Sequence, residues 1–494
     1  MFLMGFDNNK YLKMQSEKIR ERIGTFGDKL YLEFGGKLFD DYHASRVLPG
    51  FEPDSKIKML LELKENAEIV IVINSEDIET GKIRRDLGIT YDMDVLRLAE
   101  IFSNIGLYVG SVVLTRFNNQ LNVIKFEKKL HSLGLKSYRH YSIEGYPSNI
   151  SKIISEDGYG KNDYIETTKP LVVVTAPGPG SGKMAVCLSQ LYHDNNKGIK
   201  AGYAKFETFP IWNLPLQHPV NLAYEAATAD LNDVNMIDPF HLDTYKETTV
   251  NYNRDIEIFP ILKTMFEKIY GVSPYNSPTD MGVNMAGNCI VDDKACRKAS
   301  CQEIIRRYYE ARCALTQGKW DAEISHKIDF IMNTAKISIN DRKLAIVAEE
   351  LEAKTGAPAV AIELADGTII TGKTTNLLGA SSTVLLNVLK HLAGLDDAVH
   401  LLSREVIEPI QSLKTKHLKS KNPRLHTDEI LIALSICAIT DEKAKSAFDK
   451  LSELVNCEVH SSVILSQIDE SIFKKLGVHL TFTPKYQSAK LYNN

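Results

Sequence analysis

The chain lacks any run of apolar residues long enough to cross a membrane, and its cysteines show no pairing pattern. No stretch approaches the roughly 18 consecutive apolar residues that a membrane span needs. The apolar start at residues 1–4 is far too short for a signal peptide, so a cytoplasmic protein is expected. The seven cysteines include no C-x-x-C pair and no zinc-ribbon spacing. Buried free thiols are therefore expected, and no zinc.

An excess of basic residues is also missing. The formal net charge is -4, which supplies no positive field for nucleic acid or for an anionic membrane as the main partner. The metalloprotease pattern H-E-x-x-H does not occur either, so a protease is not supported. A small-molecule ligand is expected instead, and the sequence leaves open whether the chain forms a homo-oligomer.

What the chain does have is the length and composition of an ordinary globular protein with several domains. Of its 494 residues, 44% are hydrophobic and 25% are charged. At roughly 150 residues per domain, this length predicts two to four domains.

One glycine-rich segment stands out. Residues 169–183 read KPLVVVTAPGPGSGK, in which the apolar residues 171–174 predict a strand buried on both faces of a parallel sheet. Residues 184–192 predict a helix, so the glycines between them lie at a helix N-terminus, where backbone N–H groups and the helix dipole favour phosphate. Glycine also permits the positive φ angles that bring these groups close to an anion. The predicted phosphate-binding residues are Gly178, Gly180, Ser181, Gly182 and Lys183.

This loop departs from the P-loop pattern G-x-x-x-x-G-K-[ST] at both ends. Pro177 stands in place of the first glycine, and Met184 stands where a hydroxyl should hold Mg²⁺. Phosphate binding is still expected, with the metal held elsewhere or absent. An ordinary turn and a site for another anion, such as a carboxylate, remain open alternatives.

Strand-like and helix-like segments alternate along the first 206 residues. This alternation predicts a multidomain α/β protein with a doubly wound, mainly parallel sheet. Ligands of such sheets bind beyond the carboxyl ends of the strands. The expected strands are residues 30–34, 69–73, 108–114, 137–141, 171–175 and 199–206.

A second polar segment follows the first expected strand. Two glycines and a lysine repeat the chemistry of the main loop in weaker form, and an acid, an imidazole and a guanidinium come soon after. These groups suit anion binding or proton transfer, with Asp40 or His43 orienting an acceptor. A tight turn with solvated side chains is the alternative. The candidate residues are Gly35, Gly36, Lys37, Asp40, His43 and Arg46.

Carboxylates and amides crowd the segment 227–241, which contains three aspartates, two asparagines and a histidine. Oxygen ligands suit Mg²⁺, so Asp230 and Asp233 are candidates for the metal contact that Met184 cannot make. Helix caps and Asx turns explain the same residues equally well.

Three domains are expected from these patterns. Residues 1–240 form a Rossmann-like α/β domain that carries the glycine loop, residues 241–338 a mainly helical insertion, and residues 339–494 a C-terminal α/β domain. The order of elements in the last part, a helix followed by a hairpin and another helix, is similar to that of the cytidine deaminase fold. Ser381-Ser-Thr383 and Pro423-Arg-Leu-His426 stand where that family has its zinc ligands. The resemblance therefore implies the architecture without zinc-dependent deamination.

The whole chain resembles one uncharacterised family of Gram-positive bacterial proteins, known only by catalogue numbers. This resemblance implies a multidomain α/β fold with a separate C-terminal subdomain and implies no activity. The segments that carry it are residues 10–16, 32–46, 175–183, 207–213 and 457–462.

Three hypotheses about function follow. The first is a phosphoryl-transfer enzyme that uses ATP or another nucleotide with Mg²⁺, in which Lys183 neutralises the transferring group. The second is a dinucleotide-dependent enzyme in which Glu207, after the next strand, bonds a ribose. The third is a protein that senses or holds a small phosphorylated ligand without turnover.

Overall fold

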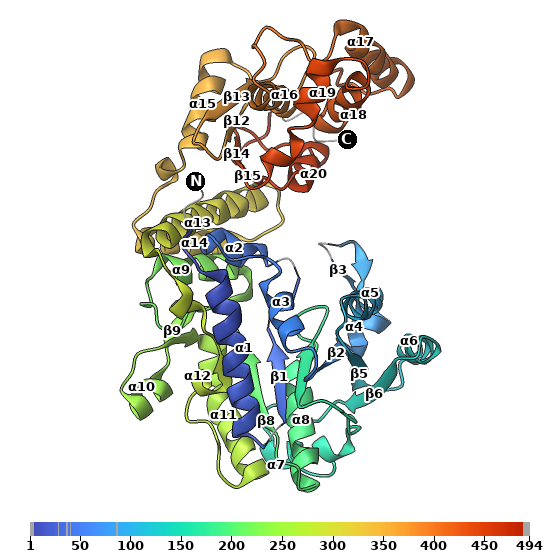
Figure 1. Cartoon of the computed structure of the whole chain (residues 1–494), viewed down its shortest axis with the longest axis vertical. Helices are drawn as coiled ribbons and strands as arrows, with labels where there is room; N and C mark the ends of the chain where they lie inside the picture. The colour runs from blue at the N-terminus through green and yellow to red at the C-terminus, as the bar shows by residue number, and fades with distance from the viewer. Residues whose placement is uncertain (1–3, 28, 36–37, 40, 85–86, 488–494) are drawn as a thin grey trace. The chain divides into compact units, whose positions relative to one another are not determined.

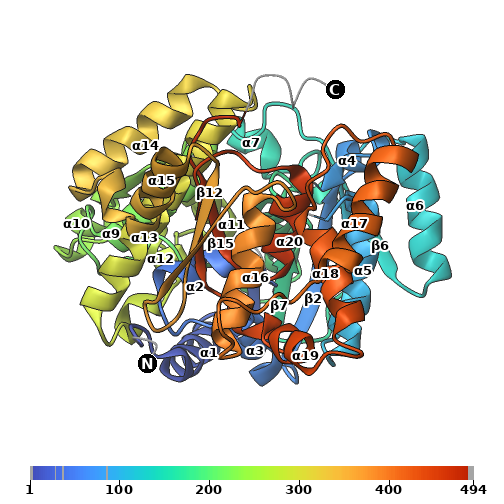
Figure 2. The same cartoon turned by 90° about the horizontal axis from the view of Figure 1, so that it is seen from above.

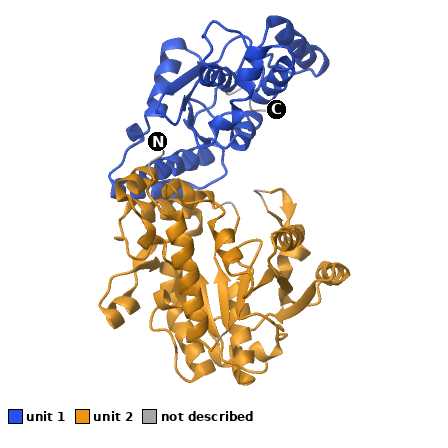
Figure 3. Cartoon of the chain, viewed as in Figure 1, with its two compact units in different colours: residues 1–2, 301–494 blue, residues 3–300 orange. Residues whose placement is uncertain are grey.

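The computed structural model of the protein describes residues 4–27, 29–35, 38–39, 41–84 and 87–487. The chain divides into two compact units, an N-terminal unit up to residue 300 and a C-terminal unit from residue 301 (Figure 3). The predicted helical insertion is split by this division, because residues 241–300 belong to the first unit and residues 301–338 to the second. Within the described residues, none of the helices combines the length with the hydropathy that a membrane crossing demands.

The N-terminal unit is built on a parallel seven-stranded sheet with helices around it, which confirms the predicted fold class (Figure 1). All six pairings between neighbouring strands are parallel. In spatial order, the strands are β11 (Gly282–Val283), β8 (Gly202–Phe206), β1 (Leu30–Phe34), β7 (Leu171–Thr175), β2 (Ala67–Asn74), β5 (Val109–Phe117) and β6 (Lys136–Tyr141).

Each of the six expected strands is present, with small differences at the ends. The strand expected at residues 199–206 begins only at Gly202, because the preceding helix ends at Asn196 and Gly198 turns the chain with a φ of 72°. Two small antiparallel ribbons were not expected: β3 (Ile83–Arg84) pairs with β4 (Ile89–Thr90), and β9 (Asn235–Ile237) pairs with β10 (Val250–Tyr252).

The helices of this unit include α8 and α11, which pack on one face of the sheet. With the bounds that the structure gives, the α-helices are α1 (Asn8–Thr25), α2 (Tyr42–Val47), α3 (Ser55–Glu62), α4 (Ser75–Glu79), α5 (Tyr91–Asn104), α6 (Leu121–Ser132), α7 (Ile150–Ile153), α8 (Lys183–Asn196), α9 (Pro219–Ala227), α10 (Pro239–Tyr245), α11 (Asn253–Tyr270) and α12 (Pro278–Met281). Helix α13 (Asp293–Thr316) spans the boundary at residue 300.

Both faces of the sheet are buried, as the apolar strands predicted. Tyr31, Val72 and Val174 point to the face on which α8 and α11 pack. On the opposite face, Lys56 of α3 lies over the Phe206 ring, 5.9 Å from its centroid. Since alternate residues of a strand face opposite sides, α3 and α8 cover different faces.

The connections reverse direction between β1 and β7. The chain leaves β1 through α2 and α3 for β2, and it leaves β7 through α8 for β8, on the other side of β1. Crossovers of opposite direction place their helices on opposite faces of the sheet and leave a crevice between the two strand ends. The ends of β7 and β1 border this crevice, and the glycine loop directly follows β7.

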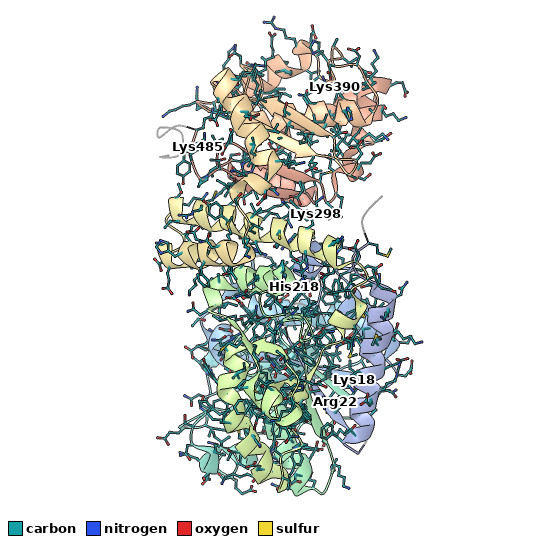
Figure 4. The ribbon with its side chains drawn as sticks, turned by 90° about the vertical axis from the view of Figure 1, so that its left-hand side faces the viewer. Lys18, Arg22, His218, Lys298, Lys390 and Lys485 are labelled. Atoms are coloured by element: carbon teal, nitrogen blue, oxygen red, sulfur yellow. The ribbon has the colours of Figure 1, made fainter. Side chains whose placement is uncertain are left out.

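The first helix, α1, contacts the chain at the sheet edge formed by β11. Lys18 and Arg22 both come from α1 (Figure 4). The Arg22 guanidinium donates to the carbonyl of Asp280, at 2.6 Å, and so ties α1 to the short segment that leads into β11. At the start of α9, the buried His218 ring lies 2.8 Å from Asp293, the first residue of α13 (Figure 4).

The C-terminal unit is a separate α/β layer structure. Its sheet has the order β13 (Ile369–Lys373), β12 (Ala359–Glu363), β14 (Glu458–Ser461) and β15 (His479–Phe482), in which only β14 and β15 are parallel. Its α-helices are α14 (Ala322–Ala335), α15 (Lys343–Thr355), α16 (Ala380–Leu392), α17 (Arg404–Ser412), α18 (Thr427–Cys437), α19 (Glu442–Phe448) and α20 (Gln467–Lys475), with part of α13.

Helices cover both faces of this smaller sheet. Val360 and Ile362 join the core formed with α16 and α18, whereas Ala361 packs against α15 (Figure 2). The expected run of helix, hairpin and helix is present as α15, β12, β13 and α16.

A buried arginine crosslinks the strands of the C-terminal unit, and this contact predicts a large effect on stability. Arg342 is 2% exposed and binds Glu458 (2.9 Å), Thr481 (3.0 Å) and the carbonyl of Val459 (3.2 Å). Arg342→Met should lower the stability of this unit by about 2–3 kcal/mol, because it leaves buried polar groups with fewer partners. Native-state hydrogen exchange of the β12 and β14 amides measures the loss.

The control is Arg404→Met, which removes an exposed arginine paired with Glu408 one helical turn away. Exposed pairs of this kind contribute about 0.3–0.5 kcal/mol, so exchange should hardly change. Equal effects of the two variants would contradict the assignment.

Candidate functional site

The glycine loop forms the N-terminus of α8, as predicted. Gly182 is the N-cap residue of this helix and has a φ of 92°, and Gly180 has a φ of 72°. Both angles lie in the left-handed region, where residues with a Cβ atom are strained, so glycine is required at both positions. The local sequence therefore sets the path that carries the chain from β7 into α8.

The loop is held in place through a carbonyl group and a close ring contact. The Thr115 hydroxyl of β5 donates to the carbonyl of Ser181 at 2.6 Å. At Gly178, an added Cβ atom would lie 2.3 Å from the ring of Tyr91, the first residue of α5. These contacts involve the carbonyl oxygen of Ser181 and the Cα atom of Gly178. Neither contact involves an N–H group of the loop.

Among the residues that the structure describes, the N–H groups of residues 178 and 180–185 make no hydrogen bond to protein. The Ser181 side chain is 4% exposed, and its hydroxyl also has no partner among those residues. Lys183 is half-buried and forms no ion pair within the same part of the chain. A helix N-terminus with open amides and an adjacent ammonium group has the donors that a phosphate needs. Phosphate binding itself stays a prediction.

The end of β1 lies at the same edge of the sheet as the glycine loop. The two strands are parallel neighbours, and Glu33 of β1 is in register with Val174 of β7. Of the residues proposed after this strand, Gly36, Lys37 and Asp40 lie outside the described residues. Gly35 is described, and its N–H faces the carbonyl of Phe206 at 3.4 Å.

A half-buried lysine lies among three carboxylates beside this edge. Lys205 of β8 is in register with Glu33 of β1. Its Nζ lies 2.6 Å from Glu207 and 2.5 Å from Asp255, the third residue of α11. Glu33 is the third carboxylate and accepts a hydrogen bond from Tyr203, at 2.7 Å. Burial would lower the pKa of Lys205, but Asp255, Glu207 and Glu33 together raise it, so the lysine stays charged.

Glu207 is an acid of this cluster whose pKa lies near neutral pH. Burial raises its pKa to about 7, against the attraction of Lys205, and the charges of Asp255 and Glu33 raise it further. Three carboxylates share one ammonium group, so the cluster holds more negative than positive charge. A carboxyl group that titrates near pH 7 is able to accept or donate a proton during a reaction.

A charge of the cluster and the charge of Lys183 in the glycine loop both influence the same thiol group. The thiol of Cys187, on the second turn of α8, has a pKa raised first by burial and then by the charge of Glu33, while Lys183 lowers it. Both charges therefore act on one buried atom. The strand order, the helix and these charges place the loop and the carboxylates at one edge of the sheet.

His43, the second residue of α2, lies among aromatic rings. Its ring contacts Phe209 and Tyr224 edge-on, with centroids 5.3 Å apart in both cases. The pKa of Tyr224 is raised by burial and by the charges of Asp41, Asp233 and Glu207. The Tyr224 hydroxyl is therefore influenced by the charge of Asp41, which follows β1, and by that of Glu207 in the carboxylate cluster. Arg46 is half-buried in the last turn of α2.

The two proposed magnesium ligands differ in their surroundings. Asp230 is exposed. Asp233 is buried and pairs with the Arg254 guanidinium. Nε of Arg254 lies 2.7 Å from one carboxylate oxygen, and Nη2 lies 2.8 Å from the other. Burial raises the pKa of Asp233, and Asp255 raises it further. No cluster of three or more metal-ligating side chains occurs among the described residues. The magnesium site at these residues stays a prediction.

Sequence reasoning missed Glu33, Lys205 and Asp255. The available signal was a charged residue at the fourth position of each of two short strands, residues 30–34 and 202–206. Such a charge needs a partner when the strand is buried. Which partner it meets depends on the order of the strands, which the sequence does not give.

The raised pKa of Glu207 predicts how stability depends on pH. The folded state holds this proton more tightly than the unfolded chain, whose glutamate titrates near 4.5. The free energy of unfolding should therefore fall as pH rises from 4.5 to about 7, by on the order of 3 kcal/mol from this group. In Glu207→Gln, urea unfolding across this range should lose that slope.

Glu144→Gln is the matched control, since Glu144 is exposed and pairs with Lys152 at 2.6 Å. Its pKa is lowered by this lysine, so its removal should leave the slope in place. An unchanged slope in Glu207→Gln would show that the raised pKa belongs elsewhere in the cluster.

Comparison with known proteins identifies relatives over the full length of the chain. Residues 4–336 match the family model described as the N-terminal domain of unknown function DUF1846, and residues 340–492 match the model of its C-terminal domain. A protein of Corynebacterium diphtheriae, UPF0371 protein DIP2346, is 59% identical over 490 residues, which are 99% of each chain. UPF0371 protein SpyM50764 of Streptococcus pyogenes is 56% identical over 492 residues, which are 100% of each chain. The predicted resemblance to a bacterial family is thereby confirmed, and the chain belongs to the DUF1846 family.

Proposed function

We propose that this protein is an enzyme that binds a nucleotide or another phosphorylated metabolite at residues 178–183 and transfers its phosphoryl group. The observation that carries the proposal is the start of α8, where open amides and Lys183 border the reversal point of the sheet. Ligands of open parallel sheets bind in this crevice, and phosphate suits a helix N-terminus.

The carboxylate cluster would supply the acid–base chemistry. An acceptor hydroxyl attacks the phosphorus atom and gives its proton to Glu207, while the bond from phosphorus to the leaving oxygen breaks. The leaving oxygen keeps the electron pair, and Lys183 neutralises the charge that moves onto the phosphoryl oxygens. A pKa near 7 lets Glu207 take up this proton at neutral pH. Asp40 and His43 remain the residues proposed to orient the acceptor.

The proposal does not depend on a magnesium ion. Asp233 already pairs with Arg254, so a metal at this carboxylate would have to displace a bidentate partner. Oxygen ligands are the chemistry that Mg²⁺ prefers, and Asp230 and Asp233 remain the residues proposed for it. The ion would help to neutralise the phosphates.

A dinucleotide enzyme is a weaker fit to the strand order. In that hypothesis Glu207 would bond a ribose whose pyrophosphate lies on the glycine loop. Strand β1 separates β7 from β8, so Glu207 follows a strand about 10 Å from the loop strand. The acid of a dinucleotide site follows the strand next to the loop strand.

The first experiment is a ligand screen on the full chain. Thermal unfolding with ATP, GTP, NAD, NADP and sugar phosphates, each with and without Mg²⁺, should give a shift for at least one phosphate compound. A ligand at 100 times its Kd adds about 2.7 kcal/mol to the stability. A screen in which no phosphate compound shifts the transition would contradict the proposal.

Lys183→Met then separates an enzyme from a protein that only binds the ligand. This change keeps the aliphatic stem and removes the charge. An enzyme should lose more turnover than affinity, because part of the lysine's contribution arises only in the transition state. Isothermal titration and a single-turnover assay with the ligand from the screen measure the two losses.

Lys128→Met is the control, since Lys128 is an exposed lysine on α6. It should change neither quantity. A loss of affinity in Lys183→Met without any turnover in the wild type would support the ligand-sensing alternative instead.

A further inference from the structure

The C-terminal unit contains a cavity of about 260 Å³ where three helices begin. Its lining includes the first residues of α16, the residue before α18 and the residue before α20. We name it the α16 cavity. Its volume is several times that of a water molecule, which occupies about 30 Å³ in the liquid, so it is large enough for a small organic ligand.

Two of the three helix starts are already capped by protein groups. The Ser466 hydroxyl accepts from the N–H of Asp469 at 3.2 Å, and so caps α20. The N–H of Thr427, the first residue of α18, donates to the Asp469 carboxylate at 3.0 Å. These two helix ends therefore offer few free donors to a ligand.

Helix α16 differs, because its N-cap residue is Gly379 and has no side chain that could accept. Within the described chain, the N–H groups of residues 380–382 make no hydrogen bond. Four N–H groups at the start of any helix need a partner outside the helix. Here these donors lie at the wall of a cavity, since Ala380 and Ser381 both line it.

The Ser381 side chain is an independent sign of a ligand. This residue is 2% exposed, yet among the described residues its hydroxyl has no hydrogen-bond partner. The neighbouring Ser382 shows the structural alternative, because its hydroxyl donates to the carbonyl of Leu425 at 2.8 Å. Because this nearly buried residue lines the cavity, its hydroxyl opens onto the cavity. Ser381 therefore offers the cavity a hydrogen bond that no described protein group takes.

A histidine on the cavity wall adds a further donor. His426 lines the cavity, and its Nδ1 lies 3.1 Å from Asp469. The same carboxylate also accepts from Thr427 and from the Ser466 hydroxyl, at 2.8 Å, so it is held by several donors. Asp469 raises the pKa of His426 through their hydrogen bond, which favours the positively charged ring. His426 thus completes a set of donors.

The remaining wall mixes apolar side chains with the polar ones of Thr374, Asn422, Arg424 and Gln487. Leu425, Val463 and Leu465 line the cavity beside these polar groups. The Arg424 guanidinium also lines it and donates to the carbonyl of Thr375 at 2.7 Å. The cavity thus combines a cluster of donors at one helix end with apolar side chains, which is the usual composition of a small-molecule site.

We propose that the α16 cavity binds a small organic anion, whose carboxylate or phosphate head accepts from the amides at the start of α16, from Ser381 and from His426. Its organic part would lie against Leu425, Val463 and Leu465. No hydrogen bond joins Ser381 to His426 in the described structure, so the site is a binding site and not a nucleophile with its base. This proposal is independent of the glycine loop and of phosphoryl transfer.

Calorimetric titration of the full chain with three probes tests the proposal. Benzoate and phenyl phosphate carry the two acidic heads on the same body, and benzyl alcohol is the neutral counterpart. One saturable site should bind at least one acid and bind benzyl alcohol at least about 10-fold more weakly. The tighter of the two acids then identifies the class of head group.

The variants locate that site in the cavity. Ser381→Ala should weaken binding about 10-fold without changing the melting temperature, because the hydroxyl has no described protein partner. Ser381→Asp should abolish binding, since it brings a carboxylate to the same donors, and an acid is favourable at a helix start. Ser382→Ala should lower the melting temperature and leave the affinity unchanged.

Two lysine variants separate this proposal from the proposed function. Lys183→Met should leave benzoate binding intact, because Lys183 belongs to the N-terminal unit. Lys390→Met should do the same, since Lys390 (Figure 4) lies in the last turn of α16, whereas the cavity is lined by the first residues of this helix. The proposal is overturned if neither acid binds in the millimolar range, if benzyl alcohol binds as well as the acids, or if Ser381→Asp still binds them.

Discussion

The ammonium group of Lys205 is the constraint on which the candidate site depends. It lies at the end of a buried strand, and a single buried charge is costly unless other charges compensate it. Asp255 and Glu207 provide that compensation and bring the start of α11 against the end of β8. The lysine thus holds like charges together, and burial of Glu207 followed by the repulsion of these charges raises its pKa.

The order of the strands determines what this cluster can act on. Because β1 lies between β7 and β8, Glu33 separates the glycine loop from Lys205. The open amides of the glycine loop and the carboxylates of the cluster therefore lie at the same edge of the sheet, with the strand β1 between the loop strand and β8. The two kinds of group are far apart in the chain, and only the parallel pairing brings them to one edge.

In each unit, the candidate site lies at a helix start that has no capping side chain. In the N-terminal unit, a glycine N-cap leaves the start of α8 open beside a lysine, and in the C-terminal unit, a glycine N-cap leaves the start of α16 open beside a buried serine. Helices α19 and α20 of the C-terminal unit instead have capping side chains, those of Asp441 and Ser466. An uncapped helix start beside other unpaired donors is therefore what distinguishes the two candidate sites.

The sequence by itself determined the elements and the glycine loop. Strands such as residues 171–175 are apolar throughout, and Gly180 and Gly182 mark positive φ angles, so local preferences decided these features. The tertiary structure alone decided which groups meet. Lys205 and Asp255 are 50 residues apart, and their pairing follows from the position of β8 in the sheet. Strand order depends on long-range packing, which no local pattern encodes, so the carboxylate cluster was beyond the reach of the sequence.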